Sequence, residues 1–273
     1  MSNKNTQILF FKKTITADAT TGVGNADETV RFDQSIKFAN NQSIKKFSVI
    51  DGYVSSAIPN VFKNGTFDNT VIHVSNDGFV ADDQTITLEA GIYSANQIAS
   101  AINASVSSLY SYLDVSDPPL QIYSNEVVGK CFIIIDSTKM ASGQLAIDLG
   151  QSDIATTLGF SATTLFDTDS THEGDVLAQL DTLGNILTVN IEGIGNTSIT
   201  NSSSSNQVAV VDLTQNTSNV YRISTAFSNV EFNIYPSREL AAYKLTFTGS
   251  RNNRQIVFTE GEIYLWFAIS EYY

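Results

Sequence analysis

The residues best suited to acid–base or thiol chemistry in this chain are few. There are two histidines, His73 and His172, and one cysteine, Cys131. His73 lies in the alternating segment 71–74, which predicts an ordinary sheet residue rather than a general base. Cys131 precedes four apolar residues, so we expect its side chain in a core, and a single cysteine allows no disulfide within the chain.

His172 stands in an acidic stretch, residues 167–175, which holds four carboxylates. Carboxylate oxygens are the ligands that Ca²⁺ prefers in proteins. The stretch lacks the Asp-x-Asp-x-Asp-Gly order of a calcium loop. The pattern therefore favours a solvated loop over a calcium site.

The sequence has none of the motifs that mark common catalytic centres. It contains no Gly-x-Ser-x-Gly elbow, no His-Glu-x-x-His pair, no phosphate-cradling glycine loop and no cysteine cluster. We therefore predict no enzyme, and no catalytic, cofactor-binding or metal-binding residue. Paired carboxylates for glycoside cleavage are defined by their separation in space, so a glycoside hydrolase or lyase on a β scaffold stays open as an alternative.

The formal charge of −13 at pH 7 is unevenly spread. Residues 1–46 have seven basic and four acidic side chains, a balance of +3, whereas residues 64–221 have two basic and eighteen acidic ones, a balance of −16. Nucleic-acid binding through the whole surface is disfavoured, because phosphate contacts need clustered lysine and arginine. If the fold separates these regions, one face is mildly basic and another strongly acidic. Acidic loops that only keep the protein soluble would give the same composition.

One helix is expected, over about residues 94–109. Ser94 and Gln97 have the spacing of a capping box. The helix should bury one apolar face, formed by Ile98, Ile102, Val106 and Leu109.

Most of the remaining chain alternates like short strands. More than ten such segments are separated by turn residues, which is typical of an antiparallel sandwich or barrel. Among them, residues 44–57 predict a strand with a bulge near Gly52, and residues 131–135 predict a buried strand that pairs with residues 144–149. The chain has no linker rich in proline or charge. We therefore expect one domain over 1–273 with loop insertions and an N-terminal arm over about 1–43.

The strand near the C-terminus is apolar on both faces. Ile263, Leu265, Phe267 and Ile269 alternate with Tyr264, Trp266 and Ala268. Such a strand is either central in a sheet or covered by a neighbouring subunit. The run is seven residues long, far short of the ~20 that a membrane-spanning helix needs.

Several segments occur in an order that together resembles a known family. They are residues 47–61, residues 86–103, the Leu158-Gly159-Phe160 turn, and the final strands 243–247 and 263–269 on either side of a charged turn at 251–254. This order is similar to the single jelly-roll penton and minor capsid proteins of the double-stranded DNA virus lineage that includes virophages, Polinton-like viruses and adenovirus-related viruses. The resemblance implies an all-β fold of two facing four-stranded sheets, with the helix in a connection between strands. It also implies a virion protein, assembled inside the host cell, that forms pentamers at capsid vertices beside other major and minor capsid proteins.

Charge sets a condition on that role. Five copies would carry about −65, and carboxylates closer than the Debye length of about 8 Å repel. Most carboxylates between residues 68 and 212 should therefore lie on outward loops. The residues expected towards neighbouring capsid proteins or the particle interior are Lys4, Lys12, Lys13, Lys45 and Lys46. The alternative is a fibre head or receptor-binding module that recognises host glycans with the loops at Asp167 or Ser202.

Overall fold

The chain folds into two compact units, each with its own hydrophobic core. The computed structural model describes residues 4–37, 44–65, 67–125, 127–180, 186–192, 198–200, 203–205, 207–212, 220–223, 231–233, 239–249 and 256–272. Unit 1 consists of Met1–Ala17, Gly24–Ile58 and Leu183–Tyr273, and unit 2 of Asp18–Val23 and Pro59–Thr182. The loop at Ser202 falls outside the described residues.

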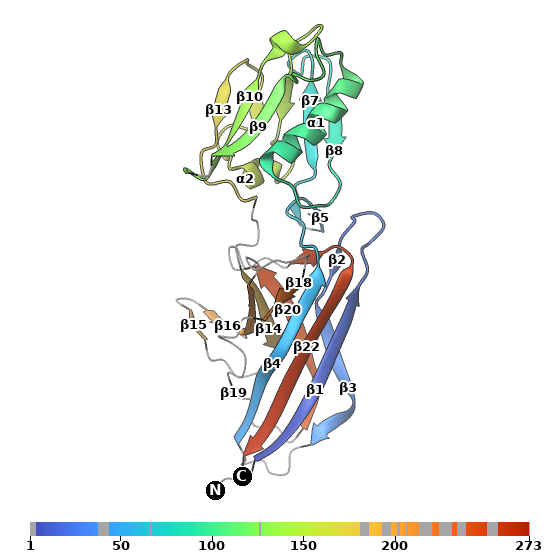
Figure 1. Ribbon diagram of the computed structural model, residues 1–273, viewed down its shortest axis with the longest axis vertical. Coiled ribbons are helices and arrows are strands. Elements are labelled where there is room, and N and C mark those ends of the chain that lie inside the picture. Colours follow the sequence, from blue (N-terminus) through green and yellow to red (C-terminus); the bar gives the residue numbers. More distant parts are fainter. Residues whose placement is uncertain are drawn as a thin grey trace. The chain divides into compact units, whose positions relative to one another are not determined.

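Unit 1 contains two antiparallel sheets (Figure 1). The β22 sheet has the order β1 (Lys4–Ile15), β22 (Gly261–Tyr272), β4 (Ile44–Ser56) and β18 (Val220–Arg222), and β19 (Glu231–Asn233) also pairs with β4. The β14 sheet has the order β17 (Gln207–Asp212), β14 (Ile186–Glu192), β20 (Glu239–Gly249) and β3 (Glu28–Lys37).

These strands interleave in the order of a jelly roll. If the eight are numbered along the chain, with β18 and β19 sharing the sixth place, one sheet reads 1-8-3-6 and the other 5-4-7-2. Apart from the neighbours β14 and β17, the paired strands are far apart in sequence, as in the paired Greek keys of a jelly roll. The prediction of an all-β antiparallel sandwich is confirmed. Within the stretch 1–43 that the sequence set apart as an arm, β1 and β3 are edge strands of the two sheets.

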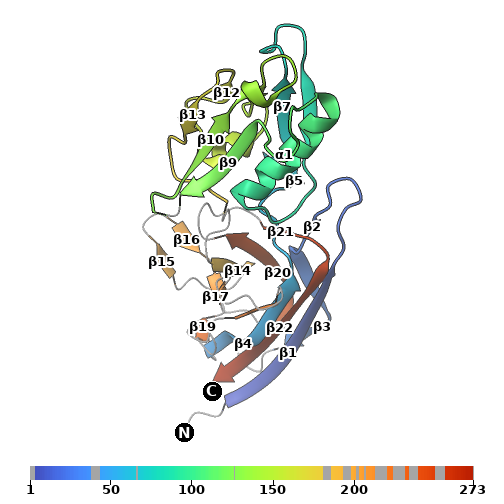
Figure 2. The same ribbon diagram turned by 45° about the horizontal axis from the view of Figure 1, so that its top comes forward.

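The core of unit 1 lies between the sheets. Ile263, Leu265 and Phe267 of β22 are fully buried, as are Leu187 and Val189 of β14. β22 pairs with β1 on one side and with β4 on the other (Figure 2), so it is central in its sheet, the first of the two alternatives that the sequence left open. The alternation of side chains along a strand sends every second residue into this core.

The bulge in β4 lies two residues before its predicted place. Trp266 pairs with Asp51 and Phe267 with Val49, which leaves Ile50 as the extra residue. Gly52 has a different role, because a Cβ there would lie 2.7 Å from side-chain atoms of both Ile223 and Leu265.

Apart from the short segment Asp18–Val23, unit 2 follows β4 and precedes β14 in the chain. One sheet has the order β13 (Thr171–Glu173), β10 (Lys130–Ile135) and β9 (Leu120–Asn125), and the other β12 (Leu165–Phe166), β11 (Ala146–Asp148), β7 (Val71–Ser75) and β8 (Gln84–Thr87). The remaining short elements of unit 2 are β5 (Lys63–Asn64), β6 (Phe67–Asp68), η1 (Ser137–Lys139) and α2 (Ile154–Leu158). Those of unit 1 are β2 (Gly24–Asn25), β15 (Ser198–Thr200), β16 (Ser203–Ser205) and β21 (Val257–Phe258). The predicted pairing of 131–135 with 144–149 is wrong, because β11 pairs with β7 and β12.

The predicted helix is α1 (Ala95–Leu109), which packs on β9. The Ser94 hydroxyl accepts the N–H of Gln97 at 3.3 Å, and the Gln97 side chain accepts the N–H of Ser94 at 2.8 Å, so the capping box is confirmed. Ile98, Ile102 and Val106 are fully buried. Leu109 is 45% exposed, so its predicted burial is wrong: it is the final residue of the helix, which passes the edge of the core there.

The helix thus lies in the connection between β4 and β14, within an insertion that has its own core. One domain over 1–273 stays a prediction. The sequence did not predict that the longest insertion forms a hydrophobic core from its own apolar side chains.

Candidate assembly surface

The outward face of the β22 sheet carries apolar side chains where an antiparallel sheet usually presents polar ones to water. Strand register places them in rows: Phe10, Trp266 and Asp51 form one row, and Lys12, Tyr264 and Tyr53 form the next. Phe10 is 56% exposed. The two rows bring together residues from both ends of the chain.

Four of these side chains form one cluster, called here the aromatic face: Phe10, Tyr53, Tyr264 and Trp266. The ring centroids of Phe10 and Trp266 are 5.1 Å apart, and those of Tyr53 and Tyr264 are 4.6 Å apart and stacked. Phe10 and Tyr264 are 6.1 Å apart, and Tyr53 and Trp266 6.3 Å. All lie within the range of favourable aromatic pairs, so the cluster is continuous. It extends along β1 to Ile8, which is 68% exposed.

Charged groups border this cluster. Lys12 Nζ lies 2.7 Å from Glu262 Oε1 and 5.1 Å from the centre of the Tyr264 ring. The Tyr264 hydroxyl donates a hydrogen bond to the other oxygen of Glu262. The hydrogen bond to Glu262 raises the pKa of Lys12, and the same bond lowers the pKa of Glu262. These groups face water, so they stabilise the fold little but hold the Tyr264 ring in one orientation.

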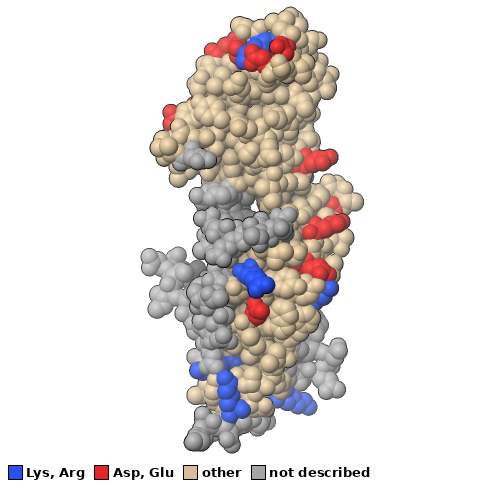
Figure 3. Space-filling view, viewed as in Figure 1, with Lys and Arg blue, Asp and Glu red and all other residues tan. Residues whose placement is uncertain are grey.

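Lysines gather where β1 begins and β22 ends (Figure 3). Lys4 and Lys46 lie over the Tyr272 ring, at 5.2 and 5.3 Å from its centre. Beside them Lys45 and Glu271 face each other in register, and both are buried. This end of unit 1 is therefore basic on its outside.

Charge divides sharply between the two units. Unit 1 has 12 basic and 11 acidic residues, a balance of +1, and unit 2 has 3 basic and 17 acidic residues, a balance of −14. Nearly all of the net charge thus belongs to the insertion. None of the helices in the described part of the chain has the length and apolar character needed to span a bilayer.

β1 is also an edge strand. Among the described strands it pairs only with β22, along all 12 of its residues. The opposite edge of β1 therefore has no strand beside it in the described structure. Long edges of this kind are the places where a further chain can add to a sheet.

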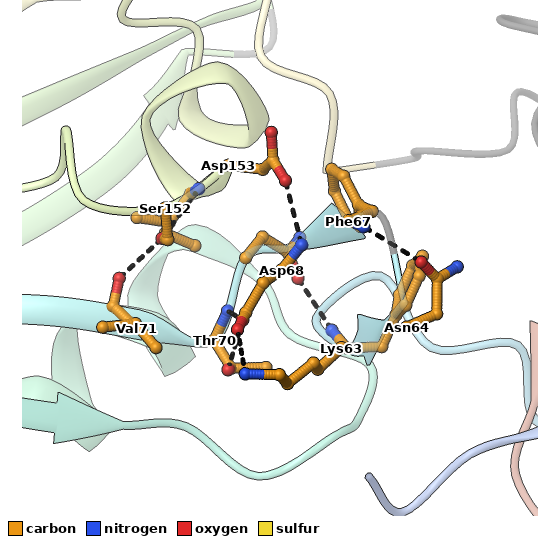
Figure 4. A network of polar contacts seen from close by, with 11 residues as sticks. Lys63, Asn64, Phe67, Asp68, Thr70, Val71, Ser152 and Asp153 are labelled. Atoms are coloured by element: carbon orange, nitrogen blue, oxygen red, sulfur yellow. Dashed lines mark hydrogen bonds and ion pairs between the residues drawn. The ribbon is translucent and has the colours of Figure 1, made fainter.

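Among the described residues of unit 2, a shallow depression of about 520 Å³ lies beside Asp68 and Asp153. Figure 4 shows the polar contacts around these two carboxylates. Lys63 Nζ is 2.8 Å from Asp68, and the N–H of Asp68 donates to Asp153 Oδ2 at 2.9 Å. Burial alone would raise the pKa of Asp68, but hydrogen bonds from Lys63 and Thr70 outweigh it and lower the pKa. Both carboxylates accept hydrogen bonds from the chain itself, so their observed role is to join the β5–β6 hairpin to the start of α2.

The second depression, of about 480 Å³, lies at the acidic loop that the sequence singled out. Its lining residues are Ser137, Thr138, Gly143, Gln144, Thr168 and Asp169. Asp169 Oδ1 accepts the N–H of Ser137 at 2.9 Å, and the Gln144 side chain donates to the carbonyl of Asp167. Within the described ranges, no group of three His, Cys, Asp or Glu side chains is placed to hold a metal ion.

The two histidines and the cysteine have separate surroundings, and each has contacts of its own. His73 lies on β7 as predicted, with Nδ1 2.7 Å from Asp83. His172 lies in β13, within the stretch predicted as loop, and its Nε2 is 2.8 Å from the Ser170 hydroxyl. Cys131 is buried as predicted, and burial raises the pKa of its thiol to about 11. A thiol with that pKa stays protonated at neutral pH.

The loop after β7 is held by two carboxylates. Asp77 accepts hydrogen bonds from the N–H groups of Val80, Ala81 and Asp82. The Tyr110 hydroxyl donates to Asp82, and this bond, followed by one from Gln84, lowers the pKa of Asp82. Asp77 thus accepts from local backbone N–H groups, whereas Asp82 accepts from the side chains of Tyr110 and Gln84.

Comparisons with known proteins find similar solved structures, and two of them come from virophages. The mavirus penton protein aligns with a TM-score of 0.43 and 14% identity, over 97% of this chain and 99% of that chain. A chain of the Sputnik virophage structure, solved by cryo-electron microscopy, aligns with a TM-score of 0.42 and 10% identity, over 96% of this chain and 97% of that chain. No protein-family model and no curated protein matches the chain.

Proposed function

We propose that the protein is a structural component of a viral capsid, a penton protein that forms pentamers at the vertices. The aromatic face carries this proposal. A solvent-facing sheet with aromatic side chains at its centre and a free edge strand is typical of a surface that is covered in the working assembly. The jelly-roll order of unit 1 is compatible with that role, since capsid proteins are among the users of this architecture.

The division of charge supports assembly through unit 1. In five copies, the five unit 2 parts together have a formal charge of about −70, whereas the five unit 1 parts have only about +5. Repulsion between like charges is therefore smallest when the copies meet through unit 1 and direct unit 2 away from the shell. The lysines that we expect towards neighbouring capsid proteins or the particle interior all belong to β1 and β4 of unit 1: Lys4, Lys12, Lys13, Lys45 and Lys46. Lys45 is buried opposite Glu271, so it offers no surface to a neighbour, and the expectation is kept for the other four.

The oligomeric state of the purified full chain tests this function. Native mass spectrometry and sedimentation at micromolar concentration should show pentamers, and more salt should favour them because it screens the acidic units. A chain that remains monomeric at every salt concentration would contradict the proposal. Cryo-electron microscopy of intact particles should then place five copies around each vertex.

A receptor-binding module is the second candidate. The depression at the Asp167 loop favours it, because hydroxyl and amide groups such as those of Thr138, Gln144 and Thr168 can hydrogen-bond to sugar hydroxyls. Binding to immobilised glycans, together with trimers in place of pentamers, would favour this candidate over the penton.

A further inference from the structure

We propose that a second copy of this chain covers the aromatic face, and that the edge of β1 with which no described strand pairs lies inside the same contact. This inference rests on the proposed assembly and names the surface through which the copies meet.

The arrangement of side chains matches the anatomy of a protein interface. Two aromatic pairs occupy the middle, and charged groups such as Lys12, Glu262 and Asp51 stand around them. Interfaces draw most of their binding energy from such central aromatic side chains, while a polar rim excludes water. Phe10 and Ile8, both more than half exposed, are the side chains that would lose most contact with water.

The charge balance of this face favours a second copy of this chain as the partner. The outward face of the three long strands carries Lys4, Lys12 and Lys46 against Asp51 and Glu262, a balance of only +1. Two such faces, or one face and another part of unit 1, can approach without strong repulsion. A nucleic acid would need a denser cluster of cations than this face has. Unit 2 of another copy has a formal charge of −14, which the balance of +1 on this face cannot neutralise.

The size of the face fits a contact between proteins. Three strands at about 4.8 Å spacing and about 40 Å long cover roughly 550 Å² in projection. A standard interface buries about 800 Å² on each partner. The free edge of β1, which is 12 residues long, lies beside this face and can supply the remainder by pairing with a strand of the second copy.

Two substitutions on the face test the inference against a matched control. Ile8→Asp and Phe10→Asp place a charge on the face, at side chains exposed enough to leave the core intact. Leu113→Asp is the control, because Leu113 is 69% exposed, against 68% for Ile8, but belongs to unit 2. We expect at least about 30-fold weaker association for both face variants, and no change for the control. Circular dichroism confirms that each variant is folded.

The sole tryptophan gives a direct readout. Trp266 lies on the aromatic face, so its emission should move to shorter wavelength as wild-type protein is concentrated, and should stay constant in Phe10→Asp. Backbone amides of β1 should exchange more slowly with deuterium in the oligomer than in the monomer.

The outcomes separate the inference from the proposed function. Pentamers that both face variants leave intact would overturn the inference and keep the penton role. Wild-type dimers that the variants split would support this surface and overturn the pentamer. A wild-type monomer at all concentrations would overturn both.

Discussion

Replacing Ile102 by alanine should unfold unit 2 at a lower temperature and leave unit 1 unchanged. Ile102 lies on the buried face of α1 and is 0% exposed in the core of unit 2. The matched substitution is Ile263→Ala, at a side chain that is also 0% exposed but belongs to the core of unit 1. The two cores share no residue, so each change should act on its own unit.

The expected magnitude follows from the cavity left behind. Removing a buried isoleucine down to alanine costs about 2 to 5 kcal/mol, and about 3 kcal/mol is a central value. Unit 2 has about 130 residues, and an unfolding entropy of about 2.1 cal/mol/K per residue gives about 0.27 kcal/mol/K. The midpoint of unit 2 should therefore fall by about 11 °C.

Two signals read the units separately. Helical circular dichroism near 222 nm reports unit 2, because α1 is the longest helix among the described residues. Trp266 fluorescence reports unit 1. Ile102→Ala should shift only the first signal, and Ile263→Ala only the second. If either variant shifts both midpoints equally, the reasoning from separate cores is refuted, and the single domain over 1–273 that the sequence predicts gains support.

Three further predictions concern unit 2. Ser94→Ala removes half of the capping box and should lower the unfolding free energy by about 1 kcal/mol in urea titrations, whereas the exposed Ser107→Ala should not. Gly159→Ala should destabilise by more than Gly78→Ala in the same assay, because both have positive φ but only at Gly159 would a Cβ meet a backbone oxygen, at 2.5 Å. The lowered pKa of Asp82 stabilises the fold above the unfolded value of about 3.9, and this contribution is lost as pH falls through the folded value. The thermal midpoint should therefore drop less steeply below about pH 4 in Asp82→Asn than in wild type.

Local patterns were enough to predict several elements. The capping box at Ser94 and the spacing of Ile98, Ile102 and Val106 placed α1, because a helix start and a helix face are both set by neighbours within a few residues. Alternation in β22 placed the side chains of Phe267 and Trp266 on opposite faces of the sheet for the same reason, and the structure shows that the Phe267 face is the buried one.

Local sequence patterns could not predict which strands pair with one another. β11 has the pattern of a buried strand, and this pattern is compatible with pairing to β10 or to β7. The choice depends on contacts between distant segments, for which a single sequence has no local signal. The depression at Asp68 and Asp153 was missed for the same reason, because its residues are separated by a long stretch of chain.

The amino-acid sequence shows which residues are apolar, how they alternate, and that acidic residues concentrate between positions 64 and 221. Those properties follow from residue type and spacing alone. The folded chain was needed to learn that Phe10 packs against Trp266, that the acidic segment folds around a core of its own, and that the aromatic side chains on the outer face of the β22 sheet form one surface. The physical reason is that a sheet joins strands by hydrogen bonds between backbones, which are the same for every residue, so proximity across the sheet is set by the packing of the whole core.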